Sequence, residues 1–443
     1  MTSNGTQAAW QRFSRECHGI LGYEGLGGEQ DLAGYSINGE KPQAVLFPGS
    51  ISQVSQILAL AQDCRTPVVP AGSGTRLNPG GEPRCDYAAL SLRRLSRVID
   101  YQPANMTLEV EAGITLEEIQ KITGEKAQWL PLDPPLSKTT TAGGLIAANR
   151  SGPMRHSQGT PRDLLIGIKV VQADGTIIKG GGRVVKNVAG YDLPRLYCGS
   201  FGTLGVIVEA CFKVRPKPEK EEIVCLSFTS LTAAMEFFFR LWNSELEPLF
   251  VELSNFSPFA PETAPGFYVL TLGFGGIGEE IEYQLDWLRR QLSSDFRELE
   301  QVSSEERGRI KQTLCDFPVS GSALARFKTS LLPSKIEAFL REIESGALKS
   351  NLTVLCQSHV ASGIVHARVG KMAMIDSACE YIVRLRSCAE SLGGSLVIQE
   401  RDPSIRNKAN VSKEPQPSFR LARTIKKKLD PRGILGADSS WEV

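Results

Sequence analysis

The sequence predicts an α+β protein in which a glycine-rich first part is followed by a duplicated second part. In the first part, short apolar strands alternate with amphipathic helices and with three glycine clusters. The second part repeats one order of strands and helices, which indicates two βαββαβ units. A polar, proline-containing stretch at residues 215–222 separates the two parts and is typical of a domain boundary.

These changes of composition divide the chain into three segments. The first two are domains. The third is a surface connection rich in charge, serine and proline, followed by a basic amphipathic helix at 418–429 that returns to the first domain. Asp430-Pro431-Arg432-Gly433 ends this helix. The three segments are residues 40–218, 223–400 and 401–443.

The composition is that of an ordinary globular protein and excludes several classes of partner. The 443 residues are 41% hydrophobic, enough for a substantial core. Fifty basic residues against 49 acidic ones leave a net charge of +1, which argues against nucleic acid or an acidic membrane surface as the main partner. The ten cysteines contain no CxxC pair, so neither an iron–sulfur cluster nor a structural zinc site is indicated.

The sequence also shows no mark of export. Its first residues have neither a basic region nor an apolar stretch, and no apolar run reaches the ~20 residues of a membrane-spanning helix. The scattered cysteines fit reduced thiols. We therefore expect a cytoplasmic protein, with any membrane association being peripheral and through a partner.

In the first domain, strands and turns follow one another in a regular order. A strand at 44–47 leads into a helix that Ser50 is placed to cap. A strand at 67–70 then runs directly into a glycine-rich turn. Apolar residues alternate along 164–172, and Asp174-Gly175 is a dipeptide preferred in tight hairpins, so a hairpin is expected there.

The second domain repeats an order of elements. The first copy has a strand, a helix, two strands and a helix, at 223–228, 231–243, 249–253, 267–274 and 279–292. The second copy adds a closing strand, and its elements lie at 323–329, 335–344, 352–359, 364–369, 374–392 and 395–399. This order predicts two ferredoxin-like halves lying side by side.

The glycine-rich turn runs from Ala71 to Asn78. Its glycines let the backbone approach a pyrophosphate closely, so that successive N–H groups can point at the phosphate oxygens. The turn matches neither GxGxxG nor GxxxxGK[ST], which disfavours a Rossmann nicotinamide site. Taken alone, it is equally compatible with a plain surface turn. Its candidate binding residues are Ala71, Gly72, Ser73, Gly74, Thr75 and Arg76.

Two further glycine clusters favour the binding interpretation. Thr141-Ala142-Gly143-Gly144 enters a predicted helix, where hydroxyl groups and unobstructed N–H groups at the positive end of the dipole favour a phosphate. The third cluster runs through residues 199–207 and ends on a strand. One such cluster can be structural, but three in one domain indicate a site. Their candidates are Thr141, Gly143, Gly144, Asn149, Gly152, Gly205, Val206 and Ile207.

Residues 43–218 resemble the FAD-binding domain of the vanillyl-alcohol-oxidase, PCMH-type flavoproteins. The resemblance rests on Pro48-Gly49-Ser50, the 71–78 loop, Thr141-Ala142-Gly143-Gly144, Arg162-Asp163 and residues 199–207. Residues 186–192 and 429–435 are similar, more specifically, to the FAD-linked 2-hydroxy-acid dehydrogenases that include the FAD-binding E-type subunit of bacterial glycolate oxidase. The resemblance implies two α+β subdomains that hold FAD, with the ferredoxin-like domain as a cap over the isoalloxazine ring.

The resemblance also implies how the cofactor is held. The first loop would hold the pyrophosphate, Thr141, Gly143 and Gly144 would line it, and the backbone around Val206 would flank the adenine. Relatives with a covalently attached flavin often carry a histidine in the first loop, where this sequence has Thr75. We therefore expect non-covalent FAD.

The cap contains a candidate metal site. His359 and His366 flank a predicted turn at 361–363, which would place them directly opposite each other on paired strands. Their spacing resembles the metal site of D-lactate and 2-hydroxyglutarate dehydrogenases, and Glu400 stands where the acidic ligand of those enzymes is expected. The alternative is a cross-strand histidine pair without metal.

Three departures from the family pattern weigh against a metal. The Asp-Gly-Asn usually found between the two histidines reads Ser362-Gly363-Ile364. The histidine expected directly after the acidic ligand, a proton acceptor in relatives, is Arg401. The closing Asn-Pro-Gly reads Gly436-Ala437-Asp438. With the expected base replaced, the sequence names no catalytic residue.

The implied reaction is oxidation of a 2-hydroxy acid by hydride transfer to FAD, while a base takes the hydroxyl proton. Arg326 and Lys328 are candidates for binding the substrate carboxylate, with solvated surface charges as the alternative. Two functions stay open: an FAD-binding subunit of a glycolate oxidase or dehydrogenase, or a non-catalytic FAD subunit that stabilises such a complex or relays electrons. The resemblance implies a second flavoprotein subunit and an iron–sulfur subunit as partners.

Overall fold

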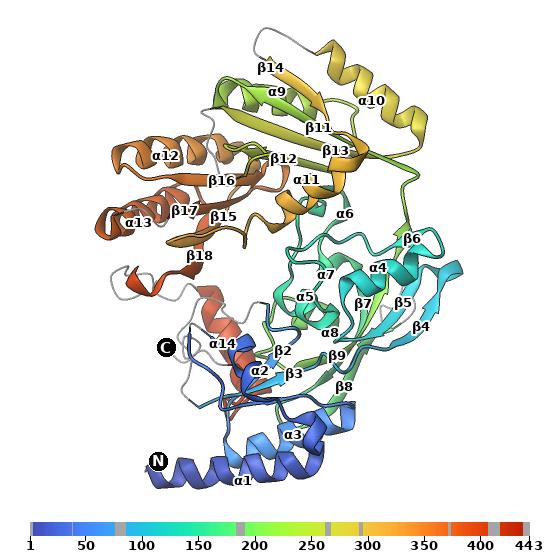
Figure 1. The fold of residues 1–443 in the computed structure, drawn as a ribbon, viewed down its shortest axis with the longest axis vertical. Helices are drawn as coiled ribbons and strands as arrows, with labels where there is room; N and C mark the ends of the chain where they lie inside the picture. The colour runs from blue at the N-terminus through green and yellow to red at the C-terminus, as the bar shows by residue number, and fades with distance from the viewer. Residues whose placement is uncertain are drawn as a thin grey trace.

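The structure is a computed structural model that describes residues 3–37, 39–75, 86–182, 191–261, 267–291, 296–370, 374–405 and 417–436. Two domains lie one above the other along the long axis of the molecule (Figure 1). The glycine-rich first part forms the lower domain, and the duplicated part forms the upper domain, which we call the cap. The predicted α+β class is confirmed.

A small parallel sheet opens the first domain. Its three strands pair in the order β1-β3-β2, and helices α1 and α3 pack against each other beside it. The Ser50 side chain accepts a hydrogen bond from the Gln53 N–H and caps α3 as predicted. The elements are α1 (Ser3–Leu21), α2 (Glu29–Gly34), β1 (Ala44–Leu46), α3 (Ile51–Cys64), β2 (Val68–Ala71) and β3 (Ala88–Ser91).

An antiparallel sheet in the order β4-β5-β9-β7-β8 completes the first domain. Strands β7 and β8 form the predicted hairpin around Asp174-Gly175. One hydrophobic core joins the two sheets, because Leu90 of the first sheet and Val54 of α3 belong to the same cluster as Val170 of the second sheet. The elements are β4 (Val98–Gln102), β5 (Thr107–Glu111), α4 (Leu116–Gly124), β6 (Gln128–Trp129), α5 (Ala142–Ala148), α6 (Arg155–Gln158), α7 (Pro161–Leu164), β7 (Leu165–Val171), β8 (Ile177–Gly181), α8 (Leu193–Tyr197), β9 (Val206–Lys213) and β10 (Arg215–Pro216).

The cap is one eight-stranded sheet in the order β14-β11-β13-β12-β16-β17-β15-β18. Each half has the predicted ferredoxin-like order, and antiparallel pairing of β12 with β16 joins them. The first half comprises β11 (Lys220–Phe228), α9 (Leu231–Trp242), β12 (Phe250–Ser254), β13 (Tyr268–Gly276), α10 (Gly278–Arg290) and β14 (Phe296–Gln301). The second comprises β15 (Ala325–Ser330), α12 (Ile336–Lys349), β16 (Val354–His359), β17 (Ile364–Val369), α13 (Ile375–Ser391) and β18 (Ser395–Arg401).

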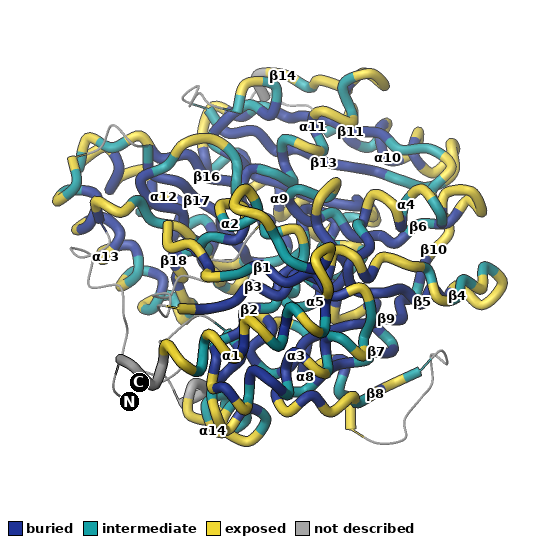
Figure 2. The backbone as a smooth tube through the Cα atoms, turned by 60° about the horizontal axis from the view of Figure 1, so that its bottom comes forward, coloured by how far each residue is buried: buried dark blue, intermediate teal, exposed yellow. Residues whose placement is uncertain are grey.

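The two faces of the cap sheet differ in chemistry. One face is apolar and packs against α9, α10, α12 and α13 in the main core of the cap, and Figure 2 shows these strands as mostly buried. The other face combines polar residues with a smaller apolar cluster that packs against Ile310 and Leu314 of α11 (Ser304–Asp316). Helix α11 lies with α6 between the two domains (Figure 1). Helix α11 stands between the two repeats and is not part of either.

The C-terminal segment lies against the first domain. After α14 (Pro417–Leu429), the Val68 N–H donates to the Ile434 carbonyl at 2.7 Å, and the Gly436 N–H donates to the Val68 carbonyl at 2.9 Å. The Lys426 ammonium also donates to the Thr203 carbonyl at 2.8 Å. These bonds place residues 434–436 beside β2, the strand that leads into the loop where the candidate site begins.

None of the helices in the described part of the chain is long and apolar enough to cross a membrane.

Candidate functional site

A single pocket in the first domain brings the three glycine clusters together. It lies between the end of β2, the start of α5 and the start of β9, and its cavity volume is about 100 Å³. The predicted cofactor residues that line it are Ala71, Gly72, Ser73, Gly74, Thr75, Thr141, Gly143, Gly144, Val206 and Ile207.

The loop after β2 leaves backbone donors for an anion. The Gly72 carbonyl accepts hydrogen bonds from the Ser91 hydroxyl at 2.9 Å and the Tyr35 hydroxyl at 3.2 Å, which fix the loop. Gly74 has φ +73°, a conformation that side chains rarely adopt. Within the described residues, the N–H groups of Ser73, Gly74 and Thr75 have no hydrogen-bond acceptor. Successive unpaired N–H groups are suited to phosphate oxygens.

The start of α5 differs from the expectation. Its first N–H groups were expected to be unobstructed, but Ala142 donates to the Ile114 carbonyl at 2.9 Å and Gly143 to the Ala112 carbonyl at 2.7 Å. The Gly144 N–H donates to the Thr141 hydroxyl at 3.3 Å. These bonds tie α5 to the chain after β5. The free donors of the pocket therefore lie in the loop after β2.

Glycine is required in this pocket for packing between its segments. A Cβ atom at Gly72 would lie closer to the Thr141 hydroxyl than the 3.0 Å that real Cβ atoms keep. A Cβ at Gly143 would lie 2.9 Å from the Ala112 Cβ. A side chain at Gly72 would therefore displace Thr141 before it could occupy the space of a pyrophosphate.

The remaining predicted cofactor residues lie outside the pocket lining. Asn149 ends α5 with φ 45° and accepts a hydrogen bond from the Cys198 thiol at 3.3 Å. Gly152 packs against the Asp133 carbonyl, and Gly205 packs against Val170. Arg76 and residues 186–190 fall outside the described residues.

Two polar side chains near the predicted cluster were missed. Arg150 lines the pocket, and the Ser151 hydroxyl is buried without a hydrogen-bond partner among the described residues. A buried polar atom that lacks a partner fits a site that a polar ligand completes. Both residues follow directly after Asn149, so their place in the second cluster was the available signal.

A second set of functional groups lies on the polar face of the cap sheet. The Glu252 carboxylate on β12 contacts the His359 Nδ1 on β16 at 2.6 Å, and its other oxygen accepts from the Gln357 amide at 2.7 Å. Glu252 and His359 are directly paired across the two strands, and both are almost fully buried. The His359 Nε2 has no hydrogen-bond partner among the described residues. The sequence did not identify Glu252.

The first domain places two charged residues opposite this pair. Asp133 accepts hydrogen bonds from the Gly152 N–H at 3.0 Å and the Met154 N–H at 2.8 Å. Burial raises the pKa of its carboxyl to about 6, although these N–H groups and His359 oppose the shift. Arg155 begins α6, which packs against β12. Burial lowers the pKa of its guanidinium, and the charges of Glu252 and Asp133 oppose that shift.

The predicted metal ligands do not come together. His359 pairs with Ile364, and His366 with Gln357, so the histidines are diagonal neighbours and the predicted register is wrong by two residues. Their rings still touch, with centroids 5.3 Å apart. Glu400 instead pairs with Arg326 at 2.8 Å. Among the described residues, no group of three or more His, Cys, Asp or Glu side chains is placed to hold a metal.

The predicted substrate cations lie on the same face of the sheet, on β15. Arg326 is buried, and it donates to Glu400, to the Ser320 carbonyl at 2.7 Å and to the Gly321 carbonyl. Its guanidinium thus serves contacts within the cap. Lys328 is partly buried and in register with His366.

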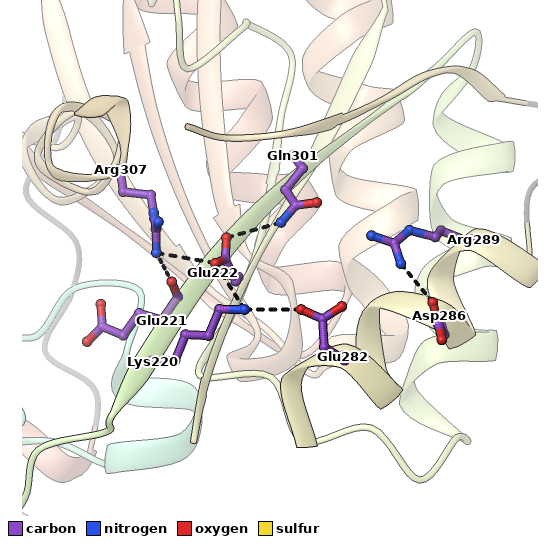
Figure 3. Close-up of polar contacts among 8 residues, drawn as sticks. All are labelled: Lys220, Glu221, Glu222, Glu282, Asp286, Arg289, Gln301 and Arg307. Atoms are coloured by element: carbon purple, nitrogen blue, oxygen red, sulfur yellow. Dashed lines mark hydrogen bonds and ion pairs between the residues drawn. The ribbon is translucent and has the colours of Figure 1, made fainter. Parts of the chain in front are cut away.

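Ion pairs also hold α11 against the cap sheet, and Figure 3 shows the one made by Arg307 at the start of β11. Arg307 of α11 lies 3.5 Å from the nearly buried Glu222 carboxylate, which also accepts from the Gln301 amide at 3.2 Å. Lys311 pairs with Glu221, and the Leu314 carbonyl accepts a second hydrogen bond from Gln357, at 3.0 Å. Helix α11 thereby covers the sheet beside the Glu252–His359 pair.

The same helix also contacts the first domain. The Leu136 N–H donates to the Asp316 carboxylate at 2.7 Å, and Cys315 lies 3.8 Å from the Asp133 carboxylate. Burial raises the pKa of the Cys315 thiol far above its usual value. Because α11 is bonded to both domains, it fixes how the cap sits over the segment that carries Asp133.

Comparison with known proteins gives the family. Residues 42–181 match the FAD binding domain, and residues 217–438 match the C-terminal domain of FAD linked oxidases. Glycolate oxidase subunit GlcD of Bacillus subtilis is 27% identical over 417 residues, covering 89% of this chain and 88% of that protein. D-lactate dehydrogenase of Archaeoglobus fulgidus is 26% identical, covering 88% and 89%. Glycolate oxidase subunit GlcE of Escherichia coli is 32% identical over 200 residues, covering 45% and 54%.

Solved structures support the fold. 4-Ethylphenol oxidase from Gulosibacter chungangensis superposes with a TM-score of 0.72 at 16% identity, covering 98% of this chain and 97% of that one. p-Cresol methylhydroxylase superposes with a TM-score of 0.68 at 16% identity, covering 98% and 96%. The expected PCMH-type fold is therefore confirmed. At these identities the likeness concerns the fold alone.

Proposed function

Because this chain belongs to the family of FAD-linked oxidases, we propose that it is the FAD-binding subunit of a glycolate oxidase or dehydrogenase. It would oxidise a small 2-hydroxy acid to the 2-oxo acid. FAD supplies the acceptor for the hydride that leaves the substrate carbon. The chain's own residues would bind the dinucleotide, exclude water and take the hydroxyl proton.

The pocket fits the cofactor. The loop from Ser73 to Thr75 offers three N–H groups to the pyrophosphate, and Thr141, Gly143 and Gly144 would form the opposite wall. None of the described residues that line the pocket is a histidine, which supports non-covalent FAD. Asn149, Gly152 and Gly205 would act by packing, as their contacts indicate.

The observation that carries a catalytic role is the Glu252–His359 pair. A carboxylate on one ring nitrogen fixes the tautomer and leaves the other nitrogen as an acceptor, the arrangement of a general base and its orienting group. The pair lies where β12 and the turn after His359 contact α6 of the first domain, the domain that carries the cofactor pocket.

A second candidate function is a non-catalytic FAD subunit, which stabilises a complex or relays electrons. Arg401 in place of the expected base favours it, as does the engagement of Glu400 by Arg326. The names of two relatives, subunits GlcD and GlcE, suggest an assembly with a second flavoprotein subunit. An iron–sulfur subunit would complete it, because its clusters could pass electrons onward one at a time. Co-purification from the native source would test both partners.

Anaerobic single-turnover reduction separates the two functions. The FAD-loaded chain is mixed with excess glycolate or D-lactate, and flavin absorbance is followed. A catalytic subunit bleaches with at least one of the two acids, at a rate that saturates with its concentration. A protein that retains FAD but keeps its absorbance with both acids would be the non-catalytic subunit.

A further inference from the structure

We propose that Arg155 binds the carboxylate of the hydroxy acid while His359 takes its hydroxyl proton, in a site that requires no metal. This assignment rests on the proposed function and names the residues that would carry it. It uses one residue from each domain, so the site is complete only when the cap lies on the first domain.

His359 is built as a proton acceptor. Its Nδ1 is held by Glu252 at 2.6 Å, and Glu252 is itself held by Gln357 at 2.7 Å. A carboxylate accepts from Nδ1–H, which leaves the Nε2 lone pair to receive a proton. That atom is buried and has no partner among the described residues, so nothing there competes for the lone pair. Glu252 is the positioning residue of this pair.

Arg155 is the arginine that remains available beside this pair. Its helix packs against β12 and against the turn Val360–Ser362 that follows His359, and Ser157 anchors it through a 2.9 Å hydrogen bond to the Leu249 carbonyl. The Arg155 guanidinium makes no hydrogen bond or ion pair with any described residue. The Glu252 and Asp133 carboxylates are nevertheless close enough to act on its charge.

The other buried arginines of the cap face are already engaged. Arg326 donates to Glu400 and to two backbone carbonyls. Arg368 donates to the Ser320 carbonyl at 2.5 Å and to the Pro261 carbonyl at 3.1 Å, and lies 5.2 Å from the Phe317 ring centroid. An incoming carboxylate would have to break these contacts. At Arg155 it would break none, and a guanidinium matches a carboxylate in charge and shape.

The chemical step balances with these groups alone and FAD. The O–H bond of the substrate breaks and its proton goes to the His359 Nε2. The C–H bond breaks with its electron pair, which leaves as hydride to the flavin, and the remaining electrons form the C=O bond of the 2-oxo acid. The substrate thus loses two electrons and two hydrogens. Glu252 stabilises the resulting imidazolium, and Arg155 holds the carboxylate, which is unchanged throughout.

The first test measures binding of oxalate, a two-carbon dicarboxylate with no C–H bond to oxidise, by calorimetry on the FAD-loaded full chain. Arg155→Gln should weaken oxalate binding by at least about tenfold, since charge-assisted hydrogen bonds are lost. Arg155→Lys should recover part of the loss. Arg289→Gln on the surface of α10 is the control, because Arg289 pairs with Asp286 away from the interface (Figure 3). Unchanged oxalate affinity in Arg155→Gln would overturn the assignment.

The second test separates His359 from Arg155. His359→Gln should bind oxalate within about threefold of the wild type but reduce its flavin with glycolate at least about 100-fold more slowly, the usual contribution of a general base. Glu252→Gln should likewise keep its oxalate affinity and be reduced more slowly than the wild type, with a smaller loss of rate than His359→Gln. If glycolate reduces the wild-type flavin, and Arg155→Gln and His359→Gln bind oxalate and are reduced as the wild type is, this inference alone is refuted. A wild type that holds FAD but neither binds oxalate nor is reduced would refute the proposed function as well.

Discussion

The cofactor pocket and the domain interface are formed by different kinds of chemical group. The pocket is formed by backbone groups and small side chains from three segments of one domain, with Ser73, Gly74 and Thr75 supplying the donors. The interface combines charged and polar side chains of the two domains and a bridging helix, Glu252 and His359 among them, with an apolar cluster that includes Met154, Phe250 and Leu314. In the pocket, an added Cβ at Gly72 or Gly143 would clash with a neighbouring segment. The interface depends instead on which side chains pair with one another.

This difference separates binding from chemistry. Damage to the pocket should remove FAD and everything that depends on it. Damage to the interface should leave FAD in place and change only substrate binding or the rate of oxidation.

Gly72→Val should abolish retention of FAD. The added Cβ would lie too close to the Thr141 hydroxyl, and the two branches would push the loop away from α5. We expect at least about a 100-fold loss of FAD affinity, measured by fluorescence titration of the apoprotein. Gly19→Val is the control for glycine replacement as such, because nothing lies within 4 Å of a Cβ there.

A compensating variant tests the reason. In Gly72→Ala, the clash is with the Thr141 side chain, so Gly72→Ala/Thr141→Ala should retain more FAD than Gly72→Ala alone. Loss of the α5 cap in Thr141→Ala itself should cost about 1 kcal/mol of stability. If the double variant binds FAD no better than Gly72→Ala, the loop is not limited by this contact.

Asp133 should give the interface a pH-dependent stability. Its carboxyl has a pKa of about 6 in the folded protein and near 4 when unfolded, so folding binds a proton between these values. The stability that this proton provides is complete below about pH 4 and is lost as the pH rises through about 6. The loss is at most about 3 kcal/mol, two pKa units at about 1.4 kcal/mol each.

The measurement is urea unfolding of the wild type and Asp133→Asn from pH 4 to pH 7.5. Other carboxylates contribute equally to both proteins, so the difference in unfolding free energy between them reports on Asp133. It should move in favour of the variant up to about pH 6 and stay level above it. A difference that is constant across the range would show that the Asp133 pKa is not raised.

Glu400→Gln should have the smallest effect. The Glu400 side chain is 59% exposed, and its ion pair with Arg326 should contribute less than about 1 kcal/mol. We expect FAD content, flavin reduction and metal content to be unchanged, with no stoichiometric divalent metal in either protein by elemental analysis. A metal that is present in the wild type and lost in the variant would show that His359, His366 and Glu400 form a metal site.

The pocket could be predicted from the sequence because glycine requirements are local. Three clusters of glycine and threonine marked the end of β2, the start of α5 and the start of β9, and the fold brings all three together. The use of the α5 N–H groups could not be predicted in the same way. The N–H groups of Ala142 and Gly143 donate to the carbonyls of Ile114 and Ala112. These carbonyls belong to the segment after β5, and tertiary packing brings them close to α5.

The interface could not be predicted because register and long-range pairing decide it. The loop at 360–363 contains a 3-10 turn and ends on Gly363 at φ 69°, which places His359 opposite Ile364. Glu252 reaches His359 only because β12 pairs with β16 across the junction of the halves. A lone acidic residue in the otherwise apolar run 249–253 was the available signal. Helix α11 was missed because it belongs to neither repeat.

The most direct test of the account is stopped-flow reduction of wild type and His359→Gln side by side, without oxygen, after equal FAD content is shown for both. We expect excess glycolate to bleach the wild-type flavin and the variant to be reduced at least about 100-fold more slowly. FAD retention by both proteins would locate the defect at the interface. Equal rates in the two proteins, or no reduction of the wild type by glycolate or D-lactate, would contradict it.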